Sequence, residues 1–323
     1  MKLFSSSDTA RFAKHWDNFH KKTVDNYMTT DVMKISPDDK LIDAANIMIG
    51  HNISSLAVVK TDDQILKGII TERDFLKKAP HDWGKLQKMK VSDIMTKSPI
   101  TAQPSLALMD ANDIMRKHLF RKIIISTEGK VDGILTQTDL VRALDDFYKD
   151  FRFSTSDSLT VKSIKKPCLL VDSNDTVAVV QKKMVKNNTG TVFVQDKKEL
   201  VGMFTEYDFL SQLALQPEEM KKQKLGDVMS FPVVAIDAEV DLFDANHLMI
   251  EKNFRRLPVL EEGKITGKIT QTIIRATGYD ILRQCQHRIE KKELEKVNFQ
   301  KLKKSRDMIR EIHGKIQEFR YAE

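Results

Sequence analysis

The sequence predicts a mixed α/β (α+β) fold built from one unit of roughly 65 residues that occurs four times and is followed by a helical C-terminal segment. The first observation is a string of glycine, two apolar residues and threonine, which begins at Gly68, Gly133 and Gly202 and recurs at Gly267 with a lysine in place of the first apolar residue. The second is that other landmarks keep the same period, such as Val91-Ser-Asp-Ile-Met95 and Leu225-Gly-Asp-Val-Met229. The third is that helical and strand-like apolar spacings follow one another in the same order in each unit.

Each unit is expected to fold in the order β-α-β-β-α. A short strand comes first, as at residues 99–102, and a helix follows it. In the first unit the buried face of this helix is predicted from apolar residues at helical spacing: Leu41, Ala44, Ala45, Ile47 and Met48. Two β-branched runs, 55–59 and 65–70, then form a hairpin, because the polar residues 60–64 between them favour a turn. The second helix begins at Thr71.

The start of this second helix carries a string with two interpretations. It reads Thr71-Glu-Arg-Asp74, Thr136-Gln-Thr-Asp139, Thr205-Glu-Tyr-Asp208 and, without the aspartate, Thr270-Gln-Thr-Ile273. In the structural interpretation the threonine caps the helix and the acid closes a capping box, which contributes about 1 kcal/mol. In the functional interpretation the helix N-terminus and the threonine hydroxyl bind a phosphate, and the carboxylate accepts hydrogen bonds from ribose hydroxyls. An isoleucine cannot accept such bonds, so the fourth site is expected to be weak or empty.

The three complete copies of this string, in register across residues 24–281, resemble the CBS domain, a small regulatory module that occurs in pairs. The resemblance implies that repeats one (24–80) and two (90–147) form one Bateman module, and that repeats three (158–215) and four (224–281) form another. It also implies a regulatory adenine nucleotide such as AMP, ADP or ATP. The threonine would face its phosphate, the aspartate its ribose, and apolar and backbone groups its adenine.

Basic residues stand where the phosphate of such a ligand would need compensation. Arg73 lies inside the first string, and the even repeats carry Arg121-Lys122 and Arg255-Arg256 just before a strand. The odd repeats have Ser54-Ser55 and Gly190-Thr191 at the same positions, which favours one shared, asymmetric phosphate pocket in each module. The alternative is that these side chains are solvated surface charges.

The basic excess of the chain lies at its two ends. The net charge is +7, of which residues 1–23 hold +3 and residues 283–323 hold +5. The C-terminal segment 282–323 reads as an amphipathic helix that packs on the repeats, pairs with a second chain as a homodimer, or docks on RNA, a ribosome or an acidic protein. An apolar stripe of Phe4, Phe12, Trp16 and Phe19 suggests that the N-terminal extension docks on the same surface. The candidate macromolecule-binding residues are Lys291, Lys292, Lys296, Lys301, Lys303, Lys304 and Arg306.

The remaining patterns argue against catalysis, metal binding and membrane insertion. The eight histidines are scattered, and the two cysteines, Cys168 and Cys285, are expected to be reduced thiols. No apolar run reaches the roughly 18 residues of a membrane span, and no signal peptide is evident, so a cytoplasmic protein is expected. We therefore predict a non-enzymatic regulatory protein, with no required cofactor, that binds adenine nucleotides and signals to a macromolecular partner. The alternatives are an RNA- or ribosome-associated factor, for example in translation regulation or ribosome hibernation, and a regulatory subunit of an enzyme or transporter.

Overall fold

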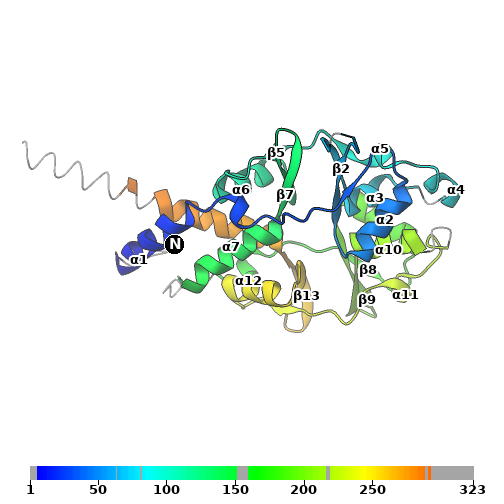
Figure 1. Cartoon of the computed structure of the whole chain (residues 1–323). Coiled ribbons are helices and arrows are strands. Elements are labelled where there is room, and N and C mark those ends of the chain that lie inside the picture. Colours follow the sequence, from blue (N-terminus) through cyan, green and yellow to red (C-terminus); the bar gives the residue numbers. More distant parts are fainter. Residues whose placement is uncertain are drawn as a thin grey trace, which may run out of the picture.

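The four predicted units form four small sheets in the structure, a computed structural model that describes residues 6–62, 64–80, 82–150, 159–215, 219–287 and 290–291. In each sheet a short first strand runs parallel to the second strand, and the second pairs antiparallel with the third. The predicted order β-α-β-β-α is confirmed. The repeats form two pairs, and in the view of Figure 1 the sheets of repeats one and three (β2, β8 and β9) lie on the right, while those of repeats two and four (β5, β7 and β13) lie nearer the terminal helices.

The N-terminal extension and the first two repeats contain the elements from α1 to α7. The N-terminal extension forms α1 Ser6–Phe19. Repeat one comprises η1 Val24–Asn26, β1 Lys34–Ile35, α2 Leu41–Gly50, β2 Ser55–Val59, β3 Leu66–Thr71 and α3 Glu72–Lys78, and α4 Trp83–Leu86 connects it to repeat two. Repeat two comprises α5 Val91–Ile94, β4 Thr96–Lys97, β5 Thr101–Ala102, α6 Leu108–Lys117, β6 Lys122–Thr127, β7 Lys130–Thr136 and α7 Gln137–Asp150. The strand expected at 99–102 begins only at Thr101, after Pro99.

The second two repeats follow the same plan. Repeat three comprises α8 Val161–Ile164, β8 Leu170–Asp172, α9 Val177–Lys186, β9 Thr191–Asp196, β10 Glu199–Thr205 and α10 Glu206–Leu215. Repeat four comprises α11 Leu225–Val228, β11 Ile236–Asp237, α12 Leu242–Glu251, β12 Arg256–Glu261 and β13 Lys264–Thr270. Residues 271–287 continue as a helix.

Paired repeats exchange the segments that lead into them, which confirms the module pairing implied by the resemblance. β4, at the start of repeat two, adds to the sheet of repeat one beside β3. In return Thr29, at the start of repeat one, bridges to Ile134 in repeat two. Repeats three and four make the equivalent bridges, Met203 to Ser230 and Lys166 to Lys268. Each module is therefore held together by backbone pairing in both directions.

The repeated glycine is explained by this exchange. A Cβ atom built on Gly68 would lie 2.7 Å from the carbonyl oxygen of Thr96, which belongs to the crossing segment of repeat two. At Gly267 it would lie 2.8 Å from the carbonyl oxygen of Lys166. Real Cβ atoms do not approach backbone oxygens so closely, so a side chain here would push the exchanged segment away. The glycine that begins each repeated string is therefore required because the segment exchanged between paired repeats packs directly on it.

Replacing Gly68 by alanine should therefore destabilise the protein by about 1–3 kcal/mol, the usual cost of overpacking a well-packed site. Gly50 provides the matched control, because a Cβ atom there would have no neighbour within 4 Å and its φ is not positive. Gly50→Ala should leave stability unchanged or raise it slightly. Chemical denaturation of both variants measures the difference, and equal midpoints would show that the crossing segment yields freely.

The hydrophobic cores do not follow the module boundaries. One core joins repeats one and three, with α10 packed on α2 and α3, and Phe75 and Phe209 are fully buried in it. A second core joins repeats two and four, where α12 packs on α7. A small third cluster of Ala57, Ile69 and Ile124 lies between the sheets of repeats one and two. Each repeat thus exchanges backbone with its module partner and shares its core with a repeat of the other module.

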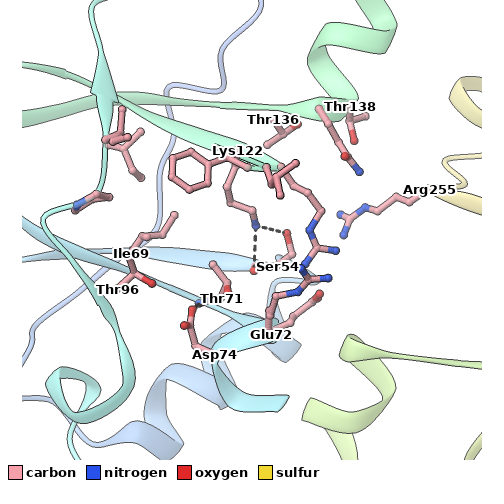
Figure 2. Close-up of a pocket in the computed structure, with 18 of the residues that line it drawn as sticks. Ser54, Ile69, Thr71, Glu72, Asp74, Thr96, Lys122, Thr136, Thr138 and Arg255 are labelled. Carbon is pink, nitrogen blue, oxygen red and sulfur yellow. Dashed lines mark hydrogen bonds between the residues drawn. The ribbon is translucent and has the colours of Figure 1, made fainter. Parts of the chain in front are cut away.

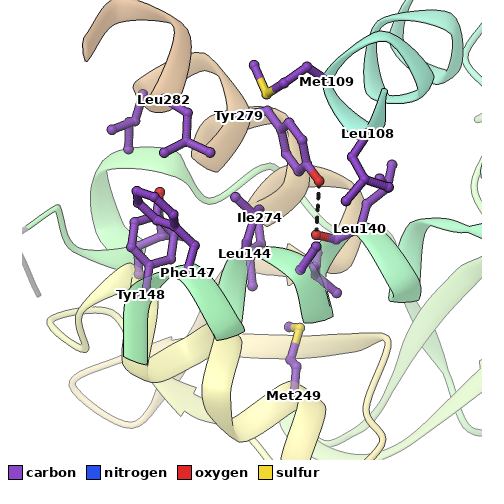
Figure 3. Close-up of a cluster of buried hydrophobic side chains, with 14 of the residues drawn as sticks. Leu108, Met109, Leu140, Leu144, Phe147, Tyr148, Met249, Ile274, Tyr279 and Leu282 are labelled. Atoms are coloured by element: carbon purple, nitrogen blue, oxygen red, sulfur yellow. Dashed lines mark hydrogen bonds between the residues drawn. The ribbon is translucent and has the colours of Figure 1, made fainter. Parts of the chain in front are cut away.

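Both terminal helices extend the second core. Phe12, Trp16 and Phe19 of α1 are buried, and the Phe19 ring lies 5.1 Å from Phe147 and 6.1 Å from Tyr279. Figure 3 shows Tyr279 and Leu282 of the C-terminal helix above α7, with the Tyr279 hydroxyl donating to the Leu140 carbonyl oxygen at 3.4 Å. The expectation that both ends dock on one surface is confirmed for these residues. Phe4 lies outside the described residues.

Candidate functional site

A cavity of about 390 Å³ opens between repeats one and two and reaches repeat four. Figure 2 shows Ile69 and Thr96 at one end, Thr71 and Asp74 below, and Arg255 at the other end. Its lining also includes apolar residues from the loops before β5 and β6 and from β6 itself. These are Pro99, Ile100, Leu119, Phe120 and Ile124. The cavity therefore runs from an apolar end, past a carboxylate, to a cationic end.

The first predicted string, Thr71 to Asp74, lies on the wall of this cavity as a capping box. One carboxylate oxygen of Asp74 accepts hydrogen bonds from the Thr71 amide at 3.0 Å and from its hydroxyl at 2.7 Å. The other oxygen faces Lys78 Nζ at 3.0 Å. The structural interpretation of the string is thus realised, and the same groups face the cavity in which the functional interpretation needs them.

The Thr-x-x-Asp segments of repeats two and three cap their helices in the same way. Of their threonines and aspartates, only Thr136 lines this cavity. Thr136 lines it, but Asp139 lines a second cavity of about 320 Å³ beside Tyr27 and Asp145. Asp208 accepts hydrogen bonds from Thr205 and from the Ser230 hydroxyl, the latter at 2.9 Å. Burial raises the pKa of both Asp139 and Asp208.

The fourth string keeps only part of this arrangement. The Thr270 hydroxyl accepts from the Ile273 amide at 3.3 Å, and no carboxylate follows. Thr270 therefore still caps its helix, while the acceptor that a ribose would require is missing from the string.

All five predicted phosphate-compensating residues line the first cavity. The sequence predicts one pocket per module, whereas the structure places the basic pairs of both even repeats together, because repeat four packs against repeat two. Four of the five are engaged within the protein: Lys122 Nζ donates to the Ser54 hydroxyl at 2.7 Å, Arg256 donates to Gly190 and Thr191, and Arg73 and Arg121 pair with a buried carboxylate. Arg255 is exposed, so the alternative of a solvated charge stays open for it. The five residues are Arg73, Arg121, Lys122, Arg255 and Arg256.

Glu206 of repeat three joins the two modules at the cationic end. Its fully buried carboxylate accepts from Arg73 Nε at 2.7 Å and from Arg121 at 2.7 Å. Burial alone would raise the pKa of Glu206, but Arg121 and Arg73 outweigh it and lower the pKa to about 2. A Cβ atom on Gly190 would lie 2.7 Å from this carboxylate, so the glycine makes room for it. One carboxylate of the second module thus pairs with two arginines of the first and leaves one positive charge uncompensated.

Sequence reasoning missed this position in all four repeats. The residue after each threonine is buried at the junction of the repeats: Glu72, Gln137, Glu206 and Gln271. In repeats one and three, Glu206 accepts from Arg73. At the equivalent positions of repeats two and four, Gln271 accepts from the Thr138 hydroxyl at 2.7 Å. The signal was available, since all four copies have Glu or Gln there, and the charge alternates between odd and even repeats.

Lys122 gives the site a pH dependence. Burial lowers the pKa of Lys122 to about 7, and Glu72 only partly opposes this. Between pH 7 and 10.5 the unfolded chain therefore binds more protons than the folded protein, so the free energy of unfolding should rise with pH by up to about 1.4 kcal/mol per unit. Lys122→Met should remove this contribution. Denaturation at pH 7, 8 and 9 tests it, and parallel curves for variant and wild type would contradict it.

The predicted macromolecule-binding residues fall almost wholly outside the described part of the chain. Lys291 is helical and exposed. The other six, Lys292 to Arg306, lie outside the described residues. Upstream, Leu282 and Cys285 are buried against the repeats. Within the described ranges, no helix is long and apolar enough to cross a membrane, and no group of three His, Cys, Asp or Glu side chains is placed to hold a metal ion.

The comparison with known proteins identifies the family. The CBS-domain family matches residues 24–81, 91–146, 161–215 and 225–277, so the chain belongs to the CBS-domain family and carries four copies in tandem. An uncharacterised protein of Methanocaldococcus jannaschii is 25% identical over 264 residues, which cover 77% of this chain and 60% of that protein. The chain therefore spans less than two thirds of that relative.

Two solved structures are also similar. Another Methanocaldococcus jannaschii protein matches with a TM-score of 0.71 at 18% identity, covering 79% of this chain and 99% of its own, which shows a shared fold. CBSX2 of Arabidopsis thaliana, crystallised in complex with AMP, is 30% identical and covers 38% of this chain and 94% of its own, with a TM-score of 0.33.

Proposed function

We propose that this protein is a non-enzymatic regulator that binds an adenine nucleotide in the cavity between repeats one and two. The observation that carries the proposal is the order of chemistry along the cavity. Ile69 and Ile100 offer an apolar seat for a base, Asp74 offers a ribose acceptor, and basic residues gather beyond it. Apolar walls with a few placed polar groups are typical of small-molecule sites. CBS-domain proteins are regulatory, which agrees with this assignment.

The charge at the cationic end suits a phosphate. Glu206 neutralises only part of the charge of Arg73 and Arg121, and Arg255 faces the same cavity with an exposed side chain. A phosphate placed here would also restore the ordinary protonation of Lys122, because an adjacent anion favours its charged form. Nucleotide binding above pH 7 is therefore expected to take up a proton.

The test is binding of AMP, ADP and ATP to the full chain. A ligand at 100 times its Kd should raise the free energy of unfolding by about 2.7 kcal/mol, and the 2′-deoxy forms should bind less well. Asp74→Asn keeps an oxygen for the Thr71 cap but loses the carboxylate, so it should weaken affinity about tenfold. Asp93 caps α5 away from the cavity, through the Lys90 amide at 2.8 Å.

Asp93→Asn therefore serves as the control for loss of a capping charge and should bind nucleotide as the wild type does. Calorimetry on both variants separates the roles. Equal affinity of the Asp74→Asn variant and the wild type, or equal binding of ribose and deoxyribose forms, would refute the ribose assignment.

The second part of the proposal is that the nucleotide state reaches a macromolecular partner through the ends of the chain. What supports it is charge: residues 283–323 hold twelve basic and seven acidic side chains. Deleting residues 292–323 should abolish salt-dependent RNA or ribosome binding while nucleotide affinity stays unchanged. RNA binding that survives the deletion would exclude the tail as anchor, and co-purification with an enzyme or transporter would favour that class of partner instead.

A further inference from the structure

Leu119 occupies a backbone conformation that leucine disfavours. The second residue after each of the helices α2, α6, α9 and α12 has a positive φ, between 47° and 57°. Three of them are asparagine (Asn52, Asn188 and Asn253), a residue that tolerates this left-handed region, and the fourth is Leu119 with φ 57°. The conformation is fixed by the helix end, because the next amide, that of Phe120, donates back to the Met115 carbonyl oxygen at 2.9 Å. Leu119 therefore carries strain that the other repeats avoid.

Folding gains little in return, because Leu119 is 84% exposed. It nevertheless lines the 390 Å³ cavity together with Phe120 and Ile100, the latter itself 39% exposed. Two exposed aliphatic side chains thus flank the apolar end of one cavity. Strained residues that persist at a binding site commonly serve the ligand rather than the fold.

The geometry points to Leu119 as a specificity residue that covers the face of the bound base, so that the chain trades stability for affinity at this one repeat. The inference rests on the proposed nucleotide site and adds which residue selects the purine over a bare phosphate compound. Burying part of the leucine surface against a flat ring would contribute about a five- to tenfold gain in affinity. The phosphate is assigned to other side chains, Arg73, Arg121 and Arg255, so its contacts should not depend on the leucine side chain.

The test is Leu119→Asn, which installs the residue of the other three repeats. Without ligand, its melting temperature should rise by about 2 °C as the strain is relieved. Its affinity for AMP should fall five- to tenfold by calorimetry, while protection by pyrophosphate stays equal to that of wild type. Asn52→Leu is the matched control: it should lower the melting temperature by a similar amount and leave AMP affinity at the Asp74 site unchanged.

The outcomes distinguish a failure of the Leu119 inference from a failure of the proposed nucleotide binding. If the wild type binds AMP and Leu119→Asn binds it equally well, the inference is wrong and the nucleotide site stands. If the variant loses pyrophosphate protection to the same extent as AMP affinity, Leu119 shapes the whole cavity and is not a base-specific contact, which also overturns the inference. If the wild type binds no adenine nucleotide, both the site and the inference fail.

Discussion

Replacing Glu206 by glutamine should lower the free energy of unfolding by about 3–5 kcal/mol, because it leaves Arg73 and Arg121 beside a neutral amide in a buried position. The same change should enlarge the stabilisation that nucleotide or pyrophosphate provides, since the two guanidinium groups lose their internal anion. Urea denaturation with and without pyrophosphate measures both effects. A variant as stable as the wild type would show that the carboxylate contributes nothing across the module boundary.

Repeats two and four supply the control for this prediction. There Thr138 donates to Gln271, at the positions equivalent to Arg73 and Glu206. The double variant Arg73→Thr, Glu206→Gln recreates that neutral pair, so it should be more stable than the sum of the two single losses predicts. Strict additivity of the two losses would contradict a direct interaction between the residues. Arg121 keeps its unpaired charge in the double variant, so recovery should be partial.

Replacing Phe209 by alanine should destabilise both modules together, by about 3–5 kcal/mol, because its fully buried ring lies in the core that repeats one and three share. The chain has two tryptophans, Trp16 and Trp83, and both precede the second module. Trp83 adjoins repeat one, and Trp16 is buried in the core that repeats two and four share, so neither tryptophan belongs to repeat three, which contains Phe209. The fluorescence midpoint should shift with the circular dichroism midpoint in a single transition.

Phe231 is the matched control, since its ring is 73% exposed. Phe231→Ala should change stability by less than about 0.5 kcal/mol, as most surface substitutions do. A Phe209→Ala variant whose tryptophan transition stays at the wild-type midpoint would mean that the modules unfold independently and that the shared core is weak.

The repeat architecture could be predicted from the sequence because it depends on local signals. The 65-residue period, the apolar spacing around Leu41 and the N-cap at Thr71 each belong to a single stretch of chain. The glycine of the string was recognised as a landmark, but its cause was not, because Thr96 crosses Gly68 only in the folded module. Local patterns show that a surface is apolar and do not show which repeat covers it, so the shared cores could not be predicted.

For the candidate site, the sequence indicates which basic residues belong to it but not how they are arranged in space. Arg121 and Arg255 were identified from the contrast between even and odd repeats, yet their meeting in one cavity depends on how repeats two and four pack. The role of Glu206 is not predictable from its place in the sequence, because an acid in the first turn of a helix is ordinarily a favourable surface charge near the positive helix end. Its burial follows only from contact with the other module.

The exchanged segments and shared cores also set the order in which the protein can form. In solenoid repeats each unit contacts only its neighbours, so folding can begin anywhere and spread. Here Thr29 pairs with Ile134, and the apolar face of α3 is buried only once α10 packs on it. The helix α10 lies more than a hundred residues downstream of α3. Contacts between such distant positions slow folding. During synthesis the first module therefore emerges with its face toward repeat three uncovered, and the growing chain carries that apolar surface until residue 215 has left the ribosome.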